Sequence, residues 1–137
     1  MSTDFTWLIG GPQGSGVESG ANIFSKVCAQ MGYQIFGKRE FYSNIKGEHS
    51  YFTVRVSDEN IHSNVNAVNL MVSFDAETIF RHFDEIVFDG GIIYDSELEN
   101  IDTDRVRTLD APFKERLHKF LESKNPEIYQ YFLFVLF

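Results

Sequence analysis

The spacing of apolar residues changes along the chain, and it predicts a mixture of strands and helices. Phe5 to Ile9 is a short apolar run that ends at a glycine-dense turn. From Val17 to Met31 the apolar residues lie three or four positions apart, which is the period of a helix with one buried face. Gly32 is expected to end that helix. A strand, a glycine loop and a helix are the opening unit of an open parallel α/β sheet.

Further strands are predicted in the middle of the chain. Tyr33 to Phe36 is a short second strand, and strict alternation from Ser50 to Val56 is typical of a half-buried one. Ile61 to Ser63, after a polar turn, is expected to be the returning strand of a hairpin. Val68 to Phe74 is rich in Val, Leu and Met, so we expect it to be a central strand.

Asp75 is predicted to cap a helix whose apolar side carries Ile79, Phe80 and Phe83. Residues 85–94 follow, and their Asp-Gly-Gly step leaves two readings open. The segment is either one strand broken by a turn or the approach to an interior strand.

The C-terminal part is predicted to begin with an exposed acidic stretch, Ser96 to Asp104. Asp110 then caps a helix with Pro112 at its first position. The last seven residues, 131–137, are almost wholly apolar and predict a buried strand. Because a complete protein rarely ends inside such a run, we expect a fragment or a truncated form of a longer polypeptide.

Together these elements predict the α/β class. We expect a single domain, residues 1–137, with an open, mostly parallel, Rossmann-like sheet. Helices should lie on both faces of this sheet, and an antiparallel hairpin is possible.

The loop between Gly10 and Gly20 suggests a place for an anion, because glycines allow close approach and a helix N-terminus favours negative charge. It lacks the lysine of a nucleotide-phosphate loop, and Glu18 adds a negative charge nearby. The loop is therefore either a tight strand-to-helix turn or a modified phosphate site. Its candidate residues are Gly11, Gln13, Gly14 and Gly16.

The composition narrows the function classes. A formal charge of −8 argues against nucleic acid or an anionic membrane as the main partner. The single cysteine, Cys28, excludes an intrachain disulfide and cannot supply the thiolates of an iron–sulfur cluster. The N-terminus has neither a basic region nor a long apolar one, so a cytoplasmic location is expected.

Residues 38–49 mix charges with aromatic rings in no clean period, which predicts a long irregular loop of functional importance. Lys46 is the first candidate to contact an acidic ligand, against the alternative of a solvated lysine. Arg39 could contact a ligand or pair with Glu40. Ser43 and Asn44 could contact a ligand or fix a turn.

The histidines show no metal-binding spacing with each other or with the cysteine, and no metal ligand or catalytic residue is assigned. His82 is expected at the surface. His49 is expected to be structural, with titration near a site as the alternative. The four histidines are His49, His62, His82 and His118.

Three stretches carry a resemblance: Ile9 to Gly16, Gly37 to Tyr51, and Val72 to Glu77. Together they resemble the gamma domain of 2-oxoacid:ferredoxin oxidoreductases. The resemblance is to the form fused at the N-terminus of the alpha subunit in archaeal-type enzymes. It covers about residues 5 to 95.

The resemblance implies an enzyme that oxidatively decarboxylates a 2-oxoacid with coenzyme A, giving acyl-CoA, carbon dioxide and reduced ferredoxin. Thiamine diphosphate, Mg and an iron–sulfur cluster would lie in other domains or subunits, so this chain alone would bind no cofactor and be inactive. It would pack on the thiamine-binding alpha and beta parts, help to wall the substrate or coenzyme A site, and meet ferredoxin through the complex. Neither nucleic acid nor a membrane is expected as a partner.

The chain departs from the family pattern in two ways, and two alternative functions also stay open. The chain ends where a fused alpha subunit would continue, and its terminal aromatic run has no counterpart in the family pattern. One alternative is a stand-alone coenzyme A- or nucleotide-binding module that uses the Gly10–Gly20 loop. The other is an assembly domain whose aromatic surface matters and whose loop does not.

Overall fold

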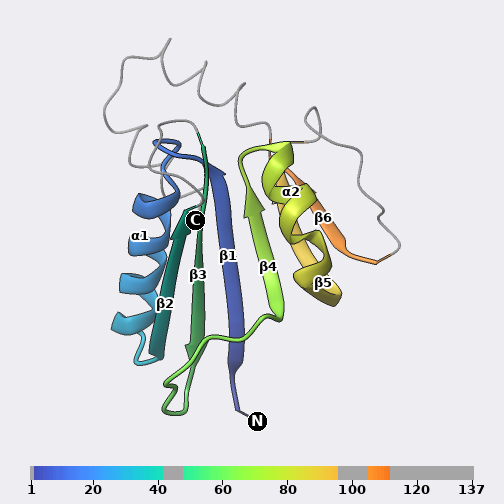
Figure 1. The fold of residues 1–137 in the computed structure, drawn as a ribbon. Coiled ribbons are helices and arrows are strands. Elements are labelled where there is room, and N and C mark those ends of the chain that lie inside the picture. The colour runs from blue at the N-terminus through green and yellow to red at the C-terminus, as the bar shows by residue number, and fades with distance from the viewer. Residues whose placement is uncertain (1, 42–47, 96–104, 112–137) are drawn as a thin grey trace.

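The computed structural model describes residues 2–41, 48–95 and 105–111, and they form one mixed sheet with a helix on each face (Figure 1). The elements are β1 (Asp4–Pro12), α1 (Val17–Gln30), β2 (Gln34–Phe41), β3 (His49–Ser57), β4 (Val68–Ser73), α2 (Ala76–His82), the 3-10 turn η1 (Phe83–Glu85), β5 (Ile86–Tyr94) and β6 (Arg107–Asp110).

The described strands lie in the order β2-β3-β1-β4-β5-β6. β1, β4, β5 and β6 run parallel to one another, whereas β3 is antiparallel to both β1 and β2. The predicted mostly parallel open sheet is therefore confirmed, together with an antiparallel part.

The antiparallel hairpin is not where the sequence places it, because residues 61–63 form no strand. Both edges of β3 are already paired, with β2 on one side and β1 on the other. A returning strand after β3 would find no edge to join. Residues 58–67 instead cross to β4, on the far side of β1.

Alternate residues of β1 build the two halves of the core. Trp7 and Ile9 pack with Val17 and Ala21 of α1 on one face of the sheet. Leu8 packs on the other face, with Ile79 of α2 and with apolar residues of β4 and β5. The predicted helices on both faces are thus confirmed, and they follow from the period of two in the central strand.

α1 is flanked by glycines, as the sequence predicts. Gly16 has φ +99° and Gly32 has φ +93°, both in the left-handed region that glycine adopts without steric cost. Cys28 is half-buried beside the core, and this burial raises the pKa of its thiol. Val27 and Met31 share its predicted apolar face but stay exposed, because burial is concentrated in the first turns of the helix.

β2 is longer than predicted, so residues 38–41 belong to a strand and not to an irregular loop. The whole strand pairs with β3, from Gln34 opposite Ser57 to Phe41 opposite Ser50. Continuous pairing with a neighbour outweighs the missing apolar alternation in an edge strand, which has little buried surface of its own. Of the rest of the predicted loop, residues 42–47 lie outside the described residues, and His49 is already the first residue of β3.

Residues 86–94 are one strand, which settles the two readings left open by the sequence. Val68 pairs with Ile86 and Leu70 with Gly91, so the register shifts between these pairs. Asp89 lies in the shifted part with φ +61°. The Asp-Gly-Gly step is therefore an irregularity inside β5, and no turn divides the strand.

α2 is capped as predicted, because the Asp75 side chain accepts a hydrogen bond from the backbone N–H of Thr78 at 2.8 Å. Ile79 is buried. Phe80, which the sequence places on the same apolar side, is 89% exposed. Successive residues of a helix point about 100° apart, so Phe80 cannot share the buried face of Ile79.

β6 is absent from the prediction, and Asp110 is its last residue. The predicted acidic stretch, the helix beginning at Pro112 and the terminal strand lie outside the described residues. Among the described helices, none is long and apolar enough to cross a membrane.

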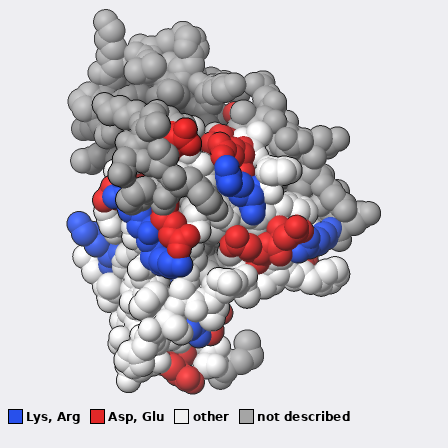
Figure 2. All heavy atoms as spheres, viewed as in Figure 1, with Lys and Arg blue, Asp and Glu red and all other residues white. Residues whose placement is uncertain are grey.

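Charged groups on the face shown in Figure 2 lie mostly beside groups of opposite sign. Arg55 contacts Asp4 at 2.7 Å, which joins β3 to the start of β1. Arg107 contacts Asp89 at 2.6 Å, which joins β6 to the irregular part of β5. Many of the charged side chains on the described surface thus form local ion pairs.

Candidate functional site

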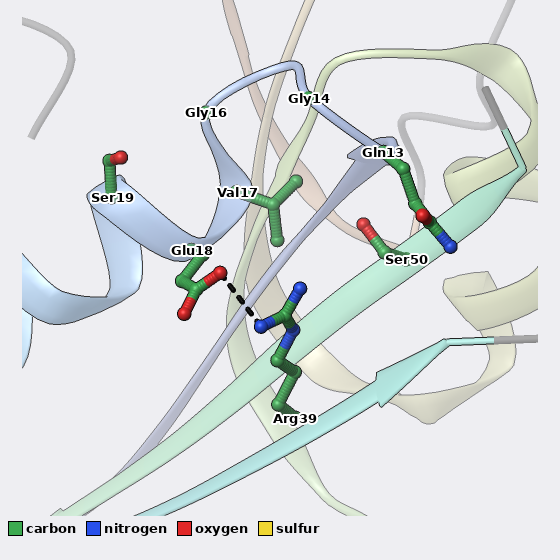
Figure 3. A pocket seen from close by; sticks show the side chains of 8 residues that line it. All are labelled: Gln13, Gly14, Gly16, Val17, Glu18, Ser19, Arg39 and Ser50. Atoms are coloured by element: carbon green, nitrogen blue, oxygen red, sulfur yellow. Dashed lines mark ion pairs between the residues drawn. The ribbon is translucent and has the colours of Figure 1, made fainter. Parts of the chain in front are cut away.

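A cavity of about 450 Å³ lies between the glycine loop, the first turn of α1 and the ends of β2 and β3 (Figure 3). It lies at the C-terminal end of β1, and parallel α/β folds commonly bind ligands at the carboxyl ends of their strands. Its lining residues are Gln13, Gly14, Gly16, Val17, Glu18, Ser19, Arg39 and Ser50.

The glycines of the loop have two different roles. Gly14 and Gly16 have φ of +88° and +99°, and a Cβ on either would meet no heavy atom within 4 Å. They are therefore needed for backbone conformation and leave open space beside them. Gly11 is needed for packing, because a Cβ there would lie 2.8 Å from Ser15 Oγ and 2.9 Å from Phe74 Cβ.

The first turn of α1 faces this cavity without a side-chain cap. Its N-cap is Gly16, which has no side chain to accept from the first backbone N–H groups. The Gln13 backbone N–H donates to the carbonyl of Glu48 at 2.9 Å, which ties the loop to the start of β3. The arrangement presents the positive end of a helix to a fixed loop.

An ion pair crosses the cavity. Arg39 Nη1 lies 2.7 Å from Glu18 Oε2, and Figure 3 shows the two side chains reaching toward each other from β2 and α1. Both are about half exposed, at 44% and 56%. The carboxylate of Glu18 is thus a partner of the Arg39 guanidinium within the cavity.

The alternative pairing of Arg39 with Glu40 is not formed, because neighbours in a strand point to opposite faces of the sheet. Glu40 instead contacts the Lys38 ammonium and accepts a hydrogen bond from the hydroxyl of Tyr51. These two contacts, Lys38 first, hold the pKa of Glu40 below its ordinary value. This polar group lines a second cavity of about 270 Å³, on the face that carries α2.

A partly buried chain of hydrogen bonds joins β3 to α2 and η1. Nε2 of His49 lies 3.0 Å from Nε2 of His82, and Nδ1 of His82 lies 2.9 Å from Glu85 Oε1. Burial first, and the neighbouring His82 second, lower the pKa of His49.

The predicted surface position of His82 is wrong, since only 2% of it is exposed. His82 follows Ile79 by three positions and so lies on the same buried face of α2. That helical spacing is the sequence signal that could have located it.

The structure brings together most of the predicted loop residues with one predicted cation. Gln13, Gly14, Gly16 and Arg39 all line the cavity, and Gly11 lies just before it in β1. Lys46, Ser43 and Asn44 lie outside the described residues, so their roles stay predictions.

Sequence reasoning missed Ser50, which also lines the cavity. It is two positions before Phe52, so strand alternation places it on the face that carries α1. The alternating pattern of this strand could therefore have indicated it.

A family model described as pyruvate ferredoxin/flavodoxin oxidoreductase matches residues 6–131. The chain belongs to this family. It is 46% identical over 120 residues to a 2-oxoacid:ferredoxin oxidoreductase alpha subunit of Saccharolobus solfataricus, across 88% of this chain and 19% of the relative. A subunit alpha of Sulfurisphaera tokodaii is 43% identical over 122 residues, with 89% and 19% covered.

These matches confirm the resemblance to the gamma-type domain at the N-terminus of archaeal alpha subunits. The chain spans about 19% of the length of these curated relatives. It is thus similar to one part of a much longer oxidoreductase subunit.

Solved structures share the fold. A 2-oxoglutarate:ferredoxin oxidoreductase from Magnetococcus marinus superposes with a TM-score of 0.78 at 21% identity, over 85% of this chain and 21% of that one. The gamma subunit of a keto/oxoacid ferredoxin oxidoreductase from Geobacter sulfurreducens gives 0.69 at 16% identity, over 80% and 61%. At these identities the likeness supports the fold alone.

Proposed function

We propose that this gamma-type domain belongs to a 2-oxoacid:ferredoxin oxidoreductase and that its loop cavity forms part of the coenzyme A site. The whole enzyme would convert a 2-oxoacid and coenzyme A to acyl-CoA, carbon dioxide and reduced ferredoxin. The observation that carries the proposal is the placement of Arg39 opposite the uncapped first turn of α1, across one cavity.

The chemistry of the cavity suits the phosphate groups of coenzyme A. A helix N-terminus offers backbone N–H donors, and a guanidinium can hold two phosphate oxygens at once. The Magnetococcus marinus structure of the same fold has 2-oxoglutarate, coenzyme A and succinyl-CoA bound. That protein therefore supports coenzyme A as the ligand to test.

Glu18 is proposed to hold the place of the ligand when coenzyme A is absent. Its carboxylate occupies the Arg39 guanidinium at 2.7 Å. A phosphate carries as much charge or more and can accept two hydrogen bonds from a guanidinium, so it can displace the carboxylate. Since the pair is half exposed, its own contribution to stability is small and little energy opposes the exchange.

Separate substitutions of Arg39 and Glu18 should change the KM for coenzyme A in opposite directions. In the assembled enzyme, Arg39→Gln should raise the KM for coenzyme A roughly tenfold, the loss expected for one charged hydrogen-bonded contact. Glu18→Gln should lower it, because the competing charge is removed. Steady-state kinetics at varied coenzyme A measures both changes.

Arg107→Gln is the matched control, because Arg107 is also an exposed arginine in an ion pair with a carboxylate, on β6 and away from the cavity. It should leave the KM for coenzyme A unchanged. Equal KM values in the Arg39 variant, the Glu18 variant and the control would show that the cavity is not part of the coenzyme A site.

Lys46 is proposed as a second cation for the 2-oxoacid or for coenzyme A, on the strength of its place in the family motif. Lys46→Ala in the assembled enzyme should raise the KM for one of these substrates with a smaller effect on folding. Unchanged kinetics would remove Lys46 from the site.

The remaining chemistry is proposed to lie in the rest of the enzyme. Thiamine diphosphate, Mg and an iron–sulfur cluster would be held by the thiamine-binding alpha and beta parts, in a cytoplasmic complex that passes electrons to ferredoxin. The isolated chain should then turn over no substrate.

Calorimetric titration of this chain with coenzyme A, ATP and NAD tests the alternative, since micromolar binding by the chain alone would favour a stand-alone binding module.

A further inference from the structure

Three side chains with metal-ligand chemistry converge on the face that carries α2. They are His49 at the start of β3, Asp75 before α2 and Glu77 in the first turn of α2. One ligand atom from each lies within 4.8 Å of the other two. His49 is buried, Asp75 is half-buried and Glu77 is exposed, so solvent reaches the group from one side.

The hydrogen-bonded chain behind His49 determines which ring nitrogen can bind an ion. His82 Nδ1 faces the carboxylate of Glu85 at 2.9 Å, so this nitrogen donates. In a neutral His82 the other nitrogen, Nε2, then accepts, and the donor 3.0 Å away is Nε2–H of His49. A neutral His49 therefore carries its lone pair on the buried Nδ1 atom.

This network leaves His49 in the form that ligates metals. A metal-bound histidine typically donates its other ring N–H to a further acceptor, which fixes the tautomer and the ring orientation. Here His82 is that acceptor, and Glu85 in turn fixes His82. The Asp75 carboxylate is also held, because the N–H and the hydroxyl of Thr78 both donate to its Oδ1, at 2.8 and 2.5 Å.

The charges of the group favour a cation. Asp75 and Glu77 bring two negative charges close to the His49 ring, whereas the N-terminus of α2 contributes about half a positive charge. Arg81 is the opposing side chain, since its guanidinium lies 2.7 Å from the Glu77 carboxylate. That pair is partly exposed, so a cation that takes Glu77 from it gives up little stability.

We propose that His49, Asp75 and Glu77 bind a divalent transition-metal ion of the zinc type. One imidazole and two carboxylates suit Zn²⁺, whereas Mg²⁺ and Ca²⁺ prefer oxygen ligands throughout. Bonds of about 2.0–2.2 Å require the ligand atoms to draw closer than 4.8 Å, and the exposed Glu77 side chain can supply this movement. Three protein ligands leave a coordination position for water, and the ion would tie α2 to β3.

The test uses the full 137-residue chain, freed of metal with a chelator and titrated calorimetrically with Zn²⁺. We expect one equivalent to bind and the melting temperature to rise, because an ion that binds only the folded state stabilises it. Asp75→Asn and Glu77→Gln should each weaken Zn²⁺ binding by at least about tenfold, as expected for the loss of a ligand. Asparagine still caps a helix, and Glu77 is exposed, so both variants should fold.

Glu59→Gln and His62→Gln are the controls, because they remove an exposed carboxylate and an exposed histidine away from this group. Both should bind Zn²⁺ like the unaltered chain. The proposal is overturned if the unaltered chain binds no Zn²⁺, or if the Asp75 and Glu77 variants bind it as tightly as the controls do. The Glu18 and Arg39 variants should bind Zn²⁺ normally, so this test is separate from that of coenzyme A binding.

Discussion

At the scale of single residues, the loop cavity depends on glycines at positive φ, where any other residue would strain the backbone. Gly16 combines a left-handed φ with the N-cap position of α1, so it sets the direction in which the helix leaves the loop. The open space around it means that conformation, and not crowding, decides what it tolerates.

Replacing Gly16 separates these two effects. Gly16→Ala should lower the free energy of unfolding by about 1–2 kcal/mol, because an alanine at φ +99° is strained. Gly16→Asn should be milder, since asparagine tolerates positive φ and can cap the helix. Urea unfolding of the chain measures both, and equal losses for the two variants would contradict the conformational explanation.

The ion pair between Asp4 and Arg55 gives a residue-scale pH dependence. The hydrogen bond from Arg55 holds the pKa of Asp4 below its ordinary value of 3.8. Its contribution to stability is therefore fully present above about pH 3.8, and it is lost as the pH falls through the lower folded-state pKa. Asp4→Asn should flatten the fall in stability in that acidic range, as measured by urea unfolding at several pH values.

A stability profile of Asp4→Asn parallel to that of the unaltered chain would show that the pair contributes nothing. The Asp4 side chain is half exposed, so the effect should shrink as salt is added.

At the scale of elements, the sequence predicts what local periodicity controls. β1, β3, β4 and α1 have buried faces, so their apolar spacing shows them directly. The second half of β2 and all of β6 lie at the two edges of the described sheet, where few positions are buried. No periodic signal marks them, and only pairing with a neighbour makes them strands.

The candidate site divides in the same way. Its glycines can be recognised from the sequence, because their spacing interrupts a strand-to-helix step. The partner of Arg39 cannot, since the contact with Glu18 depends on the register of β2 against β3 and on the position of α1. The approach of His49 to Asp75 and Glu77 depends likewise on how α2 packs on the sheet.

At the scale of the whole molecule, the two candidate sites lie on opposite faces of one sheet. The cavity is on the face of α1, and the His49 group is on the face of α2. Consecutive residues of β3 connect them, because His49 belongs to one group and Ser50 lines the other. Both lie near the C-terminal end of β1, because Pro12 pairs with His49 and Gly11 with Ser50. Whatever packs against this end of the sheet should therefore affect ligand binding at both sites.

Large exposed apolar side chains are a second feature at this scale. Phe80 is 89% exposed and Phe88 is 83% exposed, on α2 and β5. Under the proposed function, we expect these rings to contact the rest of the oxidoreductase, because large exposed apolar side chains often mark an interface. Phe80→Ser and Phe88→Ser should change the free energy of unfolding by no more than about 0.5 kcal/mol, as is usual for surface positions.

The same two variants should weaken assembly, measured by size-exclusion chromatography with the other parts of the enzyme. Ile79→Ser is the contrasting variant, because the neighbouring buried side chain should affect folding first. Assembly that is as complete with both phenylalanines replaced as without would show that neither ring contributes to the interface.

The central claim is that Arg39 and the first turn of α1 bind a phosphate of coenzyme A in place of the Glu18 carboxylate. A structure of the assembled enzyme with coenzyme A bound tests it most directly. We predict a phosphate oxygen within hydrogen-bond distance of the Arg39 guanidinium, with Glu18 turned away. Coenzyme A bound elsewhere, with the Arg39–Glu18 ion pair still closed, would contradict it.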